Sequence, residues 1–362
     1  MDYGFLLQKM KVLLLIHCQQ ARGQEIFAAQ LGDELLRNGI KVKLLSIYEG
    51  SFGLPFSGEM ESLGLRSSYG VWNPRNWHRF SNLVQEFNPD IIQANGGDTL
   101  KFLALTARFF SLKSKLIFNN GGVMGYYLKS DFQKRLNVFF LRQMDALVSV
   151  SKFSQTDLNQ YADPNLPHPV IPIAVKIPEL KYYKNEELTW VHIGGFTPEK
   201  NHQGLIQLVE EGNKLGLHGN FLLIGDGPLK GKIIEEVESK DLGERINFLG
   251  SLNHPWENLP RKSVLILPSL IEGMPGVIAE ALCQGIPVIA YRVGGIAELE
   301  QEFPSIIGIT PNQSQGFIQA MLNVQGNYES YYQQAPQMKE KAKVYFSLSR
   351  ATQDFLNLYR SL

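Results

Sequence analysis

The feature that most constrains the fold of this sequence is a repeating unit. In each copy a short apolar run is followed by a turn of small or polar residues and then by helical periodicity. The first copy consists of KVLLLIH, the turn CQQARGQ and the helical pattern EIFAAQLGDELLRNG, which Gly39 ends. Such alternation is typical of a parallel sheet with crossover helices. It predicts an α/β chain whose first strand is Val12–His17.

Small and polar residues also follow the other apolar runs of the first half. These runs, with their turns, are KVKLLSIY, PDIIQANGGD, KLIFNNGG and DALVSVSKFS. Because the carboxyl ends of parallel strands meet at one edge of a sheet, the turns are expected to face a ligand there. Residues 50–80 show no clear period and are expected to form a loop region.

The chain is long enough for two domains, and its pattern restarts in the second half. It has 362 residues, more than one core comfortably accommodates. Tyr161–Lys184 carries five prolines around the strand-like VIPIAV and is expected to contain the linker. After it, WVHIGGFTPEKNHQGLIQLVEEG gives a strand, a Gly194-Gly195 turn and a helix.

The composition excludes several classes of protein. Equal numbers of basic and acidic residues, 35 each, provide no global field that would attract nucleic acid. The two cysteines, Cys18 and Cys283, are far apart, which argues against a disulfide or zinc framework and for a reducing, cytoplasmic compartment. No apolar run approaches the roughly 18 residues of a membrane span. The sequence contains no D-x-D, HExxH or GxSxG motif.

The stretch PSLIEGMPGVIAE (Pro268–Glu280) is the most informative about function. The run VLIL before it suits a buried strand, and Pro275 and Gly276 mark the start of a helix. A helix N-terminus favours phosphate, and glycines let a phosphate approach the backbone closely. Glu272 and Glu280 lie on either side of the helix start, where carboxylates accept hydrogen bonds from sugar hydroxyls. A sugar, a diphosphate and a ribose in sequence would satisfy all three parts.

At this point the chain resembles a known family. The block SLIEGMPGVIAEALCQGIPVIAYRVGGIAE is similar to the E-x7-E region of retaining GT-B glycosyltransferases of the GT4 type (glycosyl transferases group 1). The resemblance implies two Rossmann-like domains that face a central cleft. It also implies an acceptor-side domain at 1–178, a nucleotide-sugar domain at 179–344, and a last helix at 345–362 that crosses back to the first domain.

The resemblance assigns the donor site to the second domain. Lys200 is expected on the donor diphosphate, Glu272 on the sugar hydroxyls and Glu280 on the ribose, with Glu272 and Lys200 as the catalytic pair. Relatives often have an arginine where this chain has Gly195, so half of the cationic clamp is absent. Gly225–Pro228 and Ile246–Leu252 are expected to hold the nucleobase. The full donor-binding set is Gly195, Lys200, Gly225, Gly227, Leu252, Glu272, Gly273, Met274, Pro275, Gly276, Val277 and Glu280.

The acceptor side is expected at the turns of the first domain. The candidates are Gly23, Glu25, Asn95, Asn120 and Gly121. Relatives often have histidines where this chain has Asn95 and Asn120, and asparagine can bind a sugar but is no general acid or base near neutral pH. Both asparagines are equally compatible with plain turn chemistry.

Residues 101–152 contain nine basic residues against Asp131 and Asp145. Within this stretch, FQKRLNVFFLRQM (Phe132–Met144) mixes aromatic and cationic residues, like a helix that rests on an anionic bilayer. Peripheral members of the family dock in this way to reach lipid-linked acceptors, so membrane contact is expected here. A solvated helix with one core-facing side explains the same pattern.

The sequence therefore predicts a retaining glycosyltransferase of cell-surface polysaccharide or glycolipid synthesis. Its expected partners are a nucleoside-diphosphate sugar and a glycan or lipid-linked acceptor, without a metal ion or a cofactor. Two alternatives remain open. One is an inactive scaffold, which Gly195 and Asn120 suggest, and the other is a nucleotide-sugar enzyme such as an epimerase.

Overall fold

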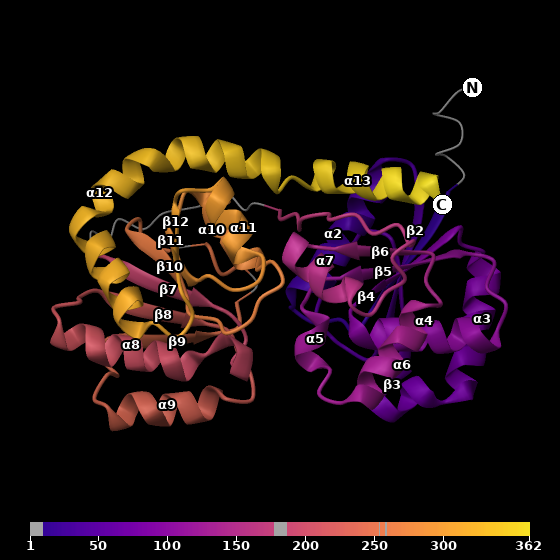
Figure 1. Cartoon of the computed structure of the whole chain (residues 1–362), viewed down its shortest axis with the longest axis horizontal. Coiled ribbons are helices and arrows are strands. Elements are labelled where there is room, and N and C mark those ends of the chain that lie inside the picture. The colour runs from indigo at the N-terminus through magenta and orange to yellow at the C-terminus, as the bar shows by residue number, and fades with distance from the viewer. Residues whose placement is uncertain (1–9, 177–186, 253, 258) are drawn as a thin grey trace. The chain divides into compact units, whose positions relative to one another are not determined.

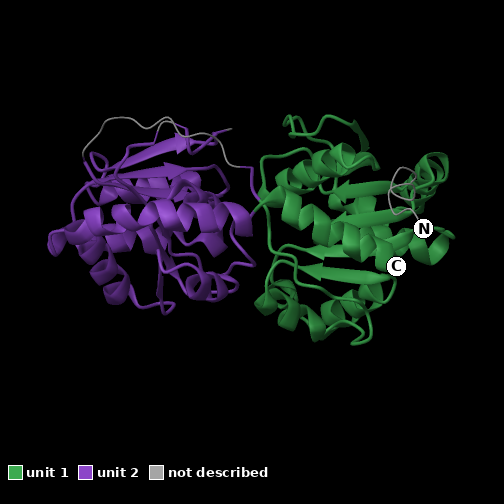
Figure 2. Cartoon of the chain, turned by 90° about the horizontal axis from the view of Figure 1, so that it is seen from above, with its two compact units in different colours: residues 1–174, 347–362 green, residues 175–346 purple. Residues whose placement is uncertain are grey.

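The computed structural model describes residues 10–176, 187–252, 254–257 and 259–362. The chain divides into two compact units (Figure 2). Unit 1 is residues 1–174 with 347–362, and unit 2 is residues 175–346. The predicted boundary between residues 178 and 179 lies outside the described residues.

Unit 1 is built on a parallel six-stranded sheet with the strand order β3-β2-β1-β4-β5-β6. Figure 1 labels most of its strands and helices. Its strands are β1 (Lys11–Ile16), β2 (Lys41–Tyr48), β3 (Glu59–Leu65), β4 (Ile91–Asn95), β5 (Lys115–Asn120) and β6 (Ala146–Ser149). Its helices are α2 (Gly23–Arg37), η1 (Ser68–Trp72), α3 (Pro74–Phe87), α4 (Gly97–Phe109), α5 (Met124–Tyr127), α6 (Asp131–Leu141), α7 (Lys152–Asn159) and α13 (Leu348–Ser361).

Unit 2 repeats the same strand order, β12-β11-β10-β7-β8-β9, and all its pairs are parallel. Its strands are β7 (Thr189–Ile193), β8 (Asn220–Ile224), β9 (Ile246–Gly250), β10 (Ser263–Leu267), β11 (Val288–Tyr291) and β12 (Ile306–Ile309). Its helices are η2 (Pro198–Lys200), α8 (His202–Lys214), α9 (Lys230–Ser239), α10 (Gly276–Gln284), α11 (Ile296–Glu302) and α12 (Ser314–Tyr345).

Central strands are buried on both faces, which explains their uninterrupted apolar sequences. In β1, Leu13 and Leu15 belong to one core of unit 1, and Val12, Leu14 and Ile16 belong to the other. A strand covered by helices on both faces needs no polar side. The predicted α/β fold with two Rossmann-like units is confirmed.

The C-terminal helix α13 belongs to the core of unit 1. Its ring of Phe355 lies 6.0 Å from that of Phe27 in α2, and Tyr359 is also buried in this core. The Tyr359 hydroxyl donates to Gln93 Oε1 in β4 at 2.6 Å. Helix α13 therefore packs, through one apolar stripe and this buried hydrogen bond, on a sheet whose first strand begins at Lys11.

The expectation of a loop region at 50–80 is wrong. That stretch contains β3 and η1, and α3 begins at Pro74. β3 is an edge strand and is only partly buried, so its sequence EMESLGL shows no clear alternation. The start of α3 did carry a local signal, because Asn73 caps the helix through Arg75 N and proline is favourable in a first turn.

Each sheet has one position where the chain order reverses direction. In unit 1 this switch point lies between β1 and β4, and in unit 2 it lies between β7 and β10. Connections leave such neighbouring strands toward opposite faces, so a crevice opens at their carboxyl ends, where open α/β sheets bind ligands.

Candidate active site

An ion pair spans the switch point of unit 2. Lys200 follows β7, Glu272 follows β10, and Lys200 Nζ lies 2.6 Å from Glu272 Oε1. The side chains are 21% and 9% exposed, so water screens this pair less than a surface pair. The structure thus brings together the two residues that the sequence proposed as catalytic.

Two hydrogen bonds hold the backbones that carry this pair. Asn201 Nδ2 donates to Pro268 O at 3.0 Å, and Leu270 N donates to Glu199 O at 2.8 Å. Asn201 also caps α8 by accepting from Gly204 N, in a left-handed conformation that asparagine tolerates. The segment containing Lys200 is therefore fixed to the segment that leads to Glu272.

Two glycines of unit 2 allow backbone contacts that a side chain would prevent. Gly294 has φ +55°, and a Cβ there would lie 1.7 Å from Glu272 O. Gly225 has φ +145°, and a Cβ there would lie 2.0 Å from Gly194 O. Gly295 N also donates to Gly273 O at 2.8 Å. These contacts hold the turns around the Lys200–Glu272 pair in one backbone geometry.

Helix α10 begins beside this pair, as the sequence predicted. Pro275 is its N-cap residue, and no side chain caps the helix. Met274 and Pro275 are buried, whereas Gly276 and Val277 are partly exposed. The first N–H groups of the helix therefore offer partial positive charge a few residues after Glu272, which suits a diphosphate.

Glu280 lies one turn inside α10, and one of its oxygens is occupied. Trp256 Nε1 donates to Glu280 Oε2 at 2.6 Å. Desolvation by burial raises the pKa of Glu280 to about 7, although the bond from Trp256 lowers it. The carboxyl group is therefore about half ionised near neutral pH. Trp256 was not foreseen, because it comes from the connection between β9 and β10.

The remaining donor-side candidates lie on the turns near β7 and β8. Gly195 is exposed, and a Cβ there would come no closer than 3.5 Å to any other residue, at Asp226 O. A Cβ at Gly227 would lie 2.7 Å from Phe196 N and O, so that glycine is required. Leu252 is 43% exposed in the connection after β9. Packing therefore does not require glycine at position 195.

A pair of buried histidines under this site was missed from the sequence. The rings of His192 and His202 are 4.6 Å apart, and Phe196 stacks on His202 at 3.9 Å. His192 Nδ1 pairs with Ile266 O at 2.9 Å. Burial lowers the pKa of His192 to about 4 and that of His202 to about 2, so both rings are neutral. The sequences around the two histidines, WVHIGG and PEKNHQ, gave only a weak indication of this pair.

The acceptor-side asparagines of unit 1 are buried. Asn95 Oδ1 accepts from Gln93 and from Asn119, and Asn95 Nδ2 donates to Leu15 O. Asn120 Oδ1 accepts from Gly122 N at 3.4 Å, while its Nδ2 has no partner among the described residues. The Asn95 amide is thus used in hydrogen bonds within unit 1, whereas Asn120 Nδ2 remains an unused donor.

Other acceptor-side candidates surround Gln24 at the start of α2. Gly23 is exposed, and Glu25 is buried and accepts from Gln20 at 2.7 Å. Burial raises the pKa of Glu25. A Cβ at Gly121 would lie 3.1 Å from Gln24 Nε2, so the end of this flexible side chain fills the space beside the turn.

The pairing of two ionisable residues at this edge was missed, although Asp98 ends a turn that was expected to face the acceptor. His17 follows β1, Asp98 lies in the first turn of α4 after β4, and His17 Nδ1 lies 3.5 Å from Asp98 Oδ2. The predicted strand Val12–His17 included His17, but β1 ends at Ile16. Only the topology, which places β1 beside β4, brings these distant residues together.

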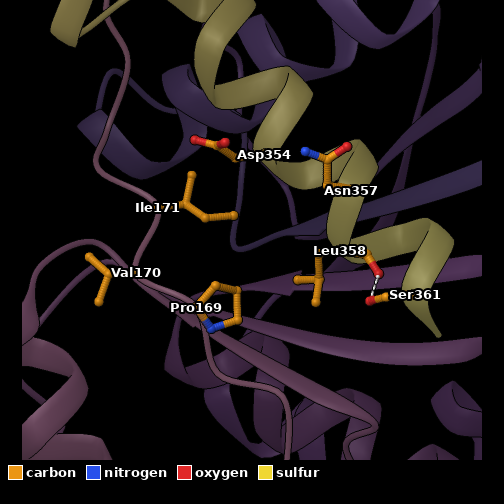
Figure 3. Close-up of a pocket in the computed structure, with 7 residues that line it drawn as sticks. All are labelled: Pro169, Val170, Ile171, Asp354, Asn357, Leu358 and Ser361. Atoms are coloured by element: carbon orange, nitrogen blue, oxygen red, sulfur yellow. Dashed lines mark hydrogen bonds between the residues drawn. The ribbon is translucent and has the colours of Figure 1, made fainter.

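Two hollows lie away from both switch points. One of about 450 Å³ lies in unit 1 between the chain at 169–171 and α13 (Figure 3). Another, of about 710 Å³, lies at the amino ends of β7 and β8 in unit 2. In the described part of the chain, no group of acidic, histidine or cysteine residues is arranged to hold a metal ion. No helix within the described ranges has the length and apolarity to cross a membrane.

Both halves of the chain match family models. Residues 179–345 match Glycosyl transferases group 1, and residues 21–177 match Glycosyltransferase Family 4. A putative glycosyltransferase, EpsF of Bacillus subtilis, is 37% identical over 98 residues, which are 27% of this chain and 26% of EpsF.

Other relatives match longer segments at lower identity. One is the N-acetylgalactosamine-N,N'-diacetylbacillosaminyl-diphospho-undecaprenol 4-alpha-N-acetylgalactosaminyltransferase of Campylobacter jejuni, 24% identical over 59% of this chain and 61% of that protein. The matches span less than two thirds of these relatives' own lengths. The solved structure of Anabaena HepE with UDP and glucose has a TM-score of 0.81 at 19% identity, covering 98% of this chain and 100% of HepE. That likeness shows the fold.

Proposed function

Because the chain belongs to the GT4-type glycosyltransferases with the GT-B fold, we propose that it transfers a sugar from a nucleoside-diphosphate sugar to an acceptor hydroxyl with retention of configuration. The observation that carries this proposal is the Lys200–Glu272 pair beside the uncapped N-terminus of α10. A cation, free N–H groups and a carboxylate match the diphosphate and the sugar of such a donor.

In the proposed reaction, unit 2 stabilises the leaving group. Lys200 and the first N–H groups of α10 bind the diphosphate, where negative charge develops as the bond from sugar C1 to the phosphate oxygen breaks. The acceptor oxygen forms its bond to C1 on the same face, and its proton passes to the departing phosphate oxygen. This scheme uses no metal ion, since the chain's own groups supply the positive charge.

The two glutamates have different parts in this scheme. Glu272 accepts hydrogen bonds from donor sugar hydroxyls and also holds Lys200 Nζ at 2.6 Å. Glu280 retains Oε1 for a ribose hydroxyl, since Trp256 occupies Oε2. Trp256 thereby orients the carboxyl group toward the ribose, and unit 1 supplies the residues that bind the acceptor.

The donor is tested first by thermal unfolding of the purified chain with UDP-, GDP-, ADP- and CDP-sugars, each with Mg²⁺ and with EDTA. Ligand that binds the folded state raises the midpoint. We expect the midpoint to rise with the sugars of one nucleotide, both with Mg²⁺ and with EDTA. UDP-sugars are the first candidates, because the solved HepE structure contains UDP. The rise should be lost in Lys200→Ala. No rise with any donor would favour an inactive scaffold instead, and release of an epimerised donor would favour an epimerase.

The second part of the proposal is contact with an anionic membrane surface, from the cytoplasmic side. Around α5 and α6, Tyr127 and Phe132 are 58% and 74% exposed, and Lys129 Nζ lies 4.3 Å from the centre of the Tyr126 ring. Large exposed aromatic side chains beside cations suit the interface of a bilayer. A lipid-linked acceptor, of the kind named for the Campylobacter relative, would lie in such a surface.

Sedimentation with lipid vesicles tests this contact. Binding to vesicles that contain phosphatidylglycerol, and weaker binding to pure phosphatidylcholine, would support it. Phe132→Ser should weaken the binding, whereas Phe109→Ser is a control at another exposed aromatic residue of unit 1. Equal sedimentation with both lipids and both variants would contradict it.

A further inference from the structure

The His17–Asp98 pair lies where a parallel sheet binds ligands. His17 directly follows β1 and Asp98 lies in the first turn of α4 after β4, so the pair spans the switch point of unit 1. The side chains are 38% and 31% exposed. The amides behind them, those of Asn95 and Asn119, are buried. The pair therefore offers ionisable atoms to a ligand at this edge.

The surrounding groups fix the orientation of both side chains. Lys101 Nζ lies 2.8 Å from Asp98 Oδ1, which leaves Oδ2 to face the imidazole. The ring of Tyr48, at the end of β2, lies 4.6 Å from the His17 ring. The Tyr48 hydroxyl is buried and has no hydrogen-bond partner among the described residues. This edge thus contains an oriented imidazole and an unused hydroxyl donor.

The imidazole is in its neutral form near pH 7. Burial lowers the pKa of His17, and the positive charges of Arg22 and Lys101 lower it further, while Asp98 raises it. A neutral ring has one N–H and one lone pair. The Asp98 carboxylate favours the N–H on Nδ1, so the lone pair is on Nε2. Nε2 has no hydrogen-bond partner in the described part of the chain.

We propose that His17, oriented by Asp98, binds a hydroxyl group of the acceptor through Nε2. The inference rests on the proposed function and assigns the acceptor contact to a residue pair within it. A hydroxyl group of the acceptor donates to Nε2 and holds the acceptor in place, while the reacting hydroxyl keeps its proton for the departing phosphate oxygen. Asp98 acts as a positioning residue, because it sets the tautomer of His17. The ligand class is a sugar or polyol hydroxyl.

The first test is nitrogen NMR of the full chain labelled with ¹⁵N-histidine. We expect the Nδ1–H tautomer for His17 in the wild type and a shift toward the Nε2–H tautomer in Asp98→Asn. Octyl glucoside and octyl galactoside, below their micelle concentrations, should move the His17 Nε2 resonance and leave that of the exposed His78 unchanged. If neither glycoside moves the His17 resonance, the inference is overturned, whatever the donor result.

The second test separates acceptor binding from donor binding. In His17→Gln, kcat/KM for transfer to the same octyl glycosides should fall about 10- to 100-fold, the effect of one lost hydrogen bond to a substrate. The thermal shift with nucleotide should remain, whereas Lys200→Ala should lose it. His78→Gln is the matched control and should transfer like the wild type. Wild-type transfer by His17→Gln would overturn the inference and leave the proposed function intact. Loss of the nucleotide shift in the wild type would instead overturn the proposed function.

Discussion

The two units have the same strand order, yet the residue pairs across their switch points differ in chemistry. In unit 2 the pair is an ammonium and a carboxylate 2.6 Å apart, and in unit 1 it is a neutral imidazole and a carboxylate 3.5 Å apart. The Lys200–Glu272 pair is also the more buried. Identical topology therefore places two residue pairs of different polarity, which we propose bind a diphosphate in unit 2 and a hydroxyl group in unit 1.

The two edges also differ in how their turns are held. In unit 2, Gly225 and Gly294 pack directly on backbone oxygens, at distances no side chain allows. Unit 1 also has one such contact, because a Cβ at Gly50 would lie 2.4 Å from Gln19 O, but at Gly96 and Gly121 the nearest neighbour is the end of the Gln24 side chain. A backbone contact cannot adjust, whereas a long side chain can take another rotamer. The turns at Gly225 and Gly294 thus contact backbone directly, whereas those at Gly96 and Gly121 contact a side chain that donates to Asn119 O at 3.1 Å.

The largest expected effect concerns the charged pair. Glu272→Gln keeps the shape of the side chain and removes its charge, and we expect kcat to fall about 100-fold or more, as when a group that stabilises the transition state is lost. The measurement is steady-state transfer. Glu302→Gln is the matched control, because Glu302 pairs with Lys341 elsewhere in unit 2. Unchanged kcat in Glu272→Gln would show that catalysis does not need the charged pair at the switch point of unit 2.

The next effect concerns the fixed turns. Gly294→Ala would place a Cβ 1.7 Å from Glu272 O at a positive φ, and we expect a loss of stability of about 3 kcal/mol, or roughly 6 °C in Tm. Gly121→Ala meets only the Gln24 side chain and should lower Tm by less than about 3 °C. Scanning calorimetry compares the two variants. Equal losses would show that unit 1 is as rigid at its edge as unit 2.

A smaller effect concerns the pH dependence of stability. The pKa of Glu280 is raised to about 7 in the folded chain, so its stabilising contribution is present at low pH and is lost as pH rises through 7. Relative to the wild type, the free energy of unfolding of Glu280→Gln should therefore increase by about 2 kcal/mol between pH 5 and pH 8. Glu25→Gln, the counterpart in unit 1, should gain less, because Gln20, a backbone hydrogen bond and the charge of Arg22 together oppose the effect of burial there. Parallel Tm curves for wild type and Glu280→Gln would contradict the raised pKa.

The smallest effect is a gain. Gly195 is exposed and a Cβ there meets nothing closer than 3.5 Å, so Gly195→Arg should fold normally. A second cation near Lys200 should tighten nucleotide binding about fivefold, or about 1 kcal/mol for a solvent-exposed charge. Calorimetric titration at low and high salt measures this gain, and Gly195→Gln controls for size. A gain that is equal in both variants would exclude a charge effect.

Local sequence signals predicted the parts of the site that lie on one turn or one helix. The strand, turn and helix from VLIL to Glu280 were predicted because each residue acts on its neighbours, and α10 begins at Gly276 as expected. The bonds across the sheet could not be predicted in the same way. Lys200 and Glu272 are 72 residues apart, and only a family resemblance connected them.

The residues that sequence reasoning missed depend on topology and burial. His17 and Asp98 meet because β1 pairs with β4, a fact that no local pattern contains. Asn95 was predicted in a turn, yet it is the last residue of β4 and its amide is used inside the sheet edge. The bond between Trp256 and Glu280 likewise joins an irregular connection to a helix. Periodicity reports which face of an element is buried, but it does not identify the partner.

The placement of α13 has a consequence for synthesis on the ribosome. The helix that fills the core of unit 1 and donates from Tyr359 to Gln93 is made after all of unit 2. At about 5–20 residues per second, the 172 residues from 175 to 346 take on the order of 10–30 s to translate. During that interval the nascent unit 1 exposes the apolar surface that Phe355 and Leu356 later cover. Unit 2 can therefore reach its native state first, although it is second along the chain.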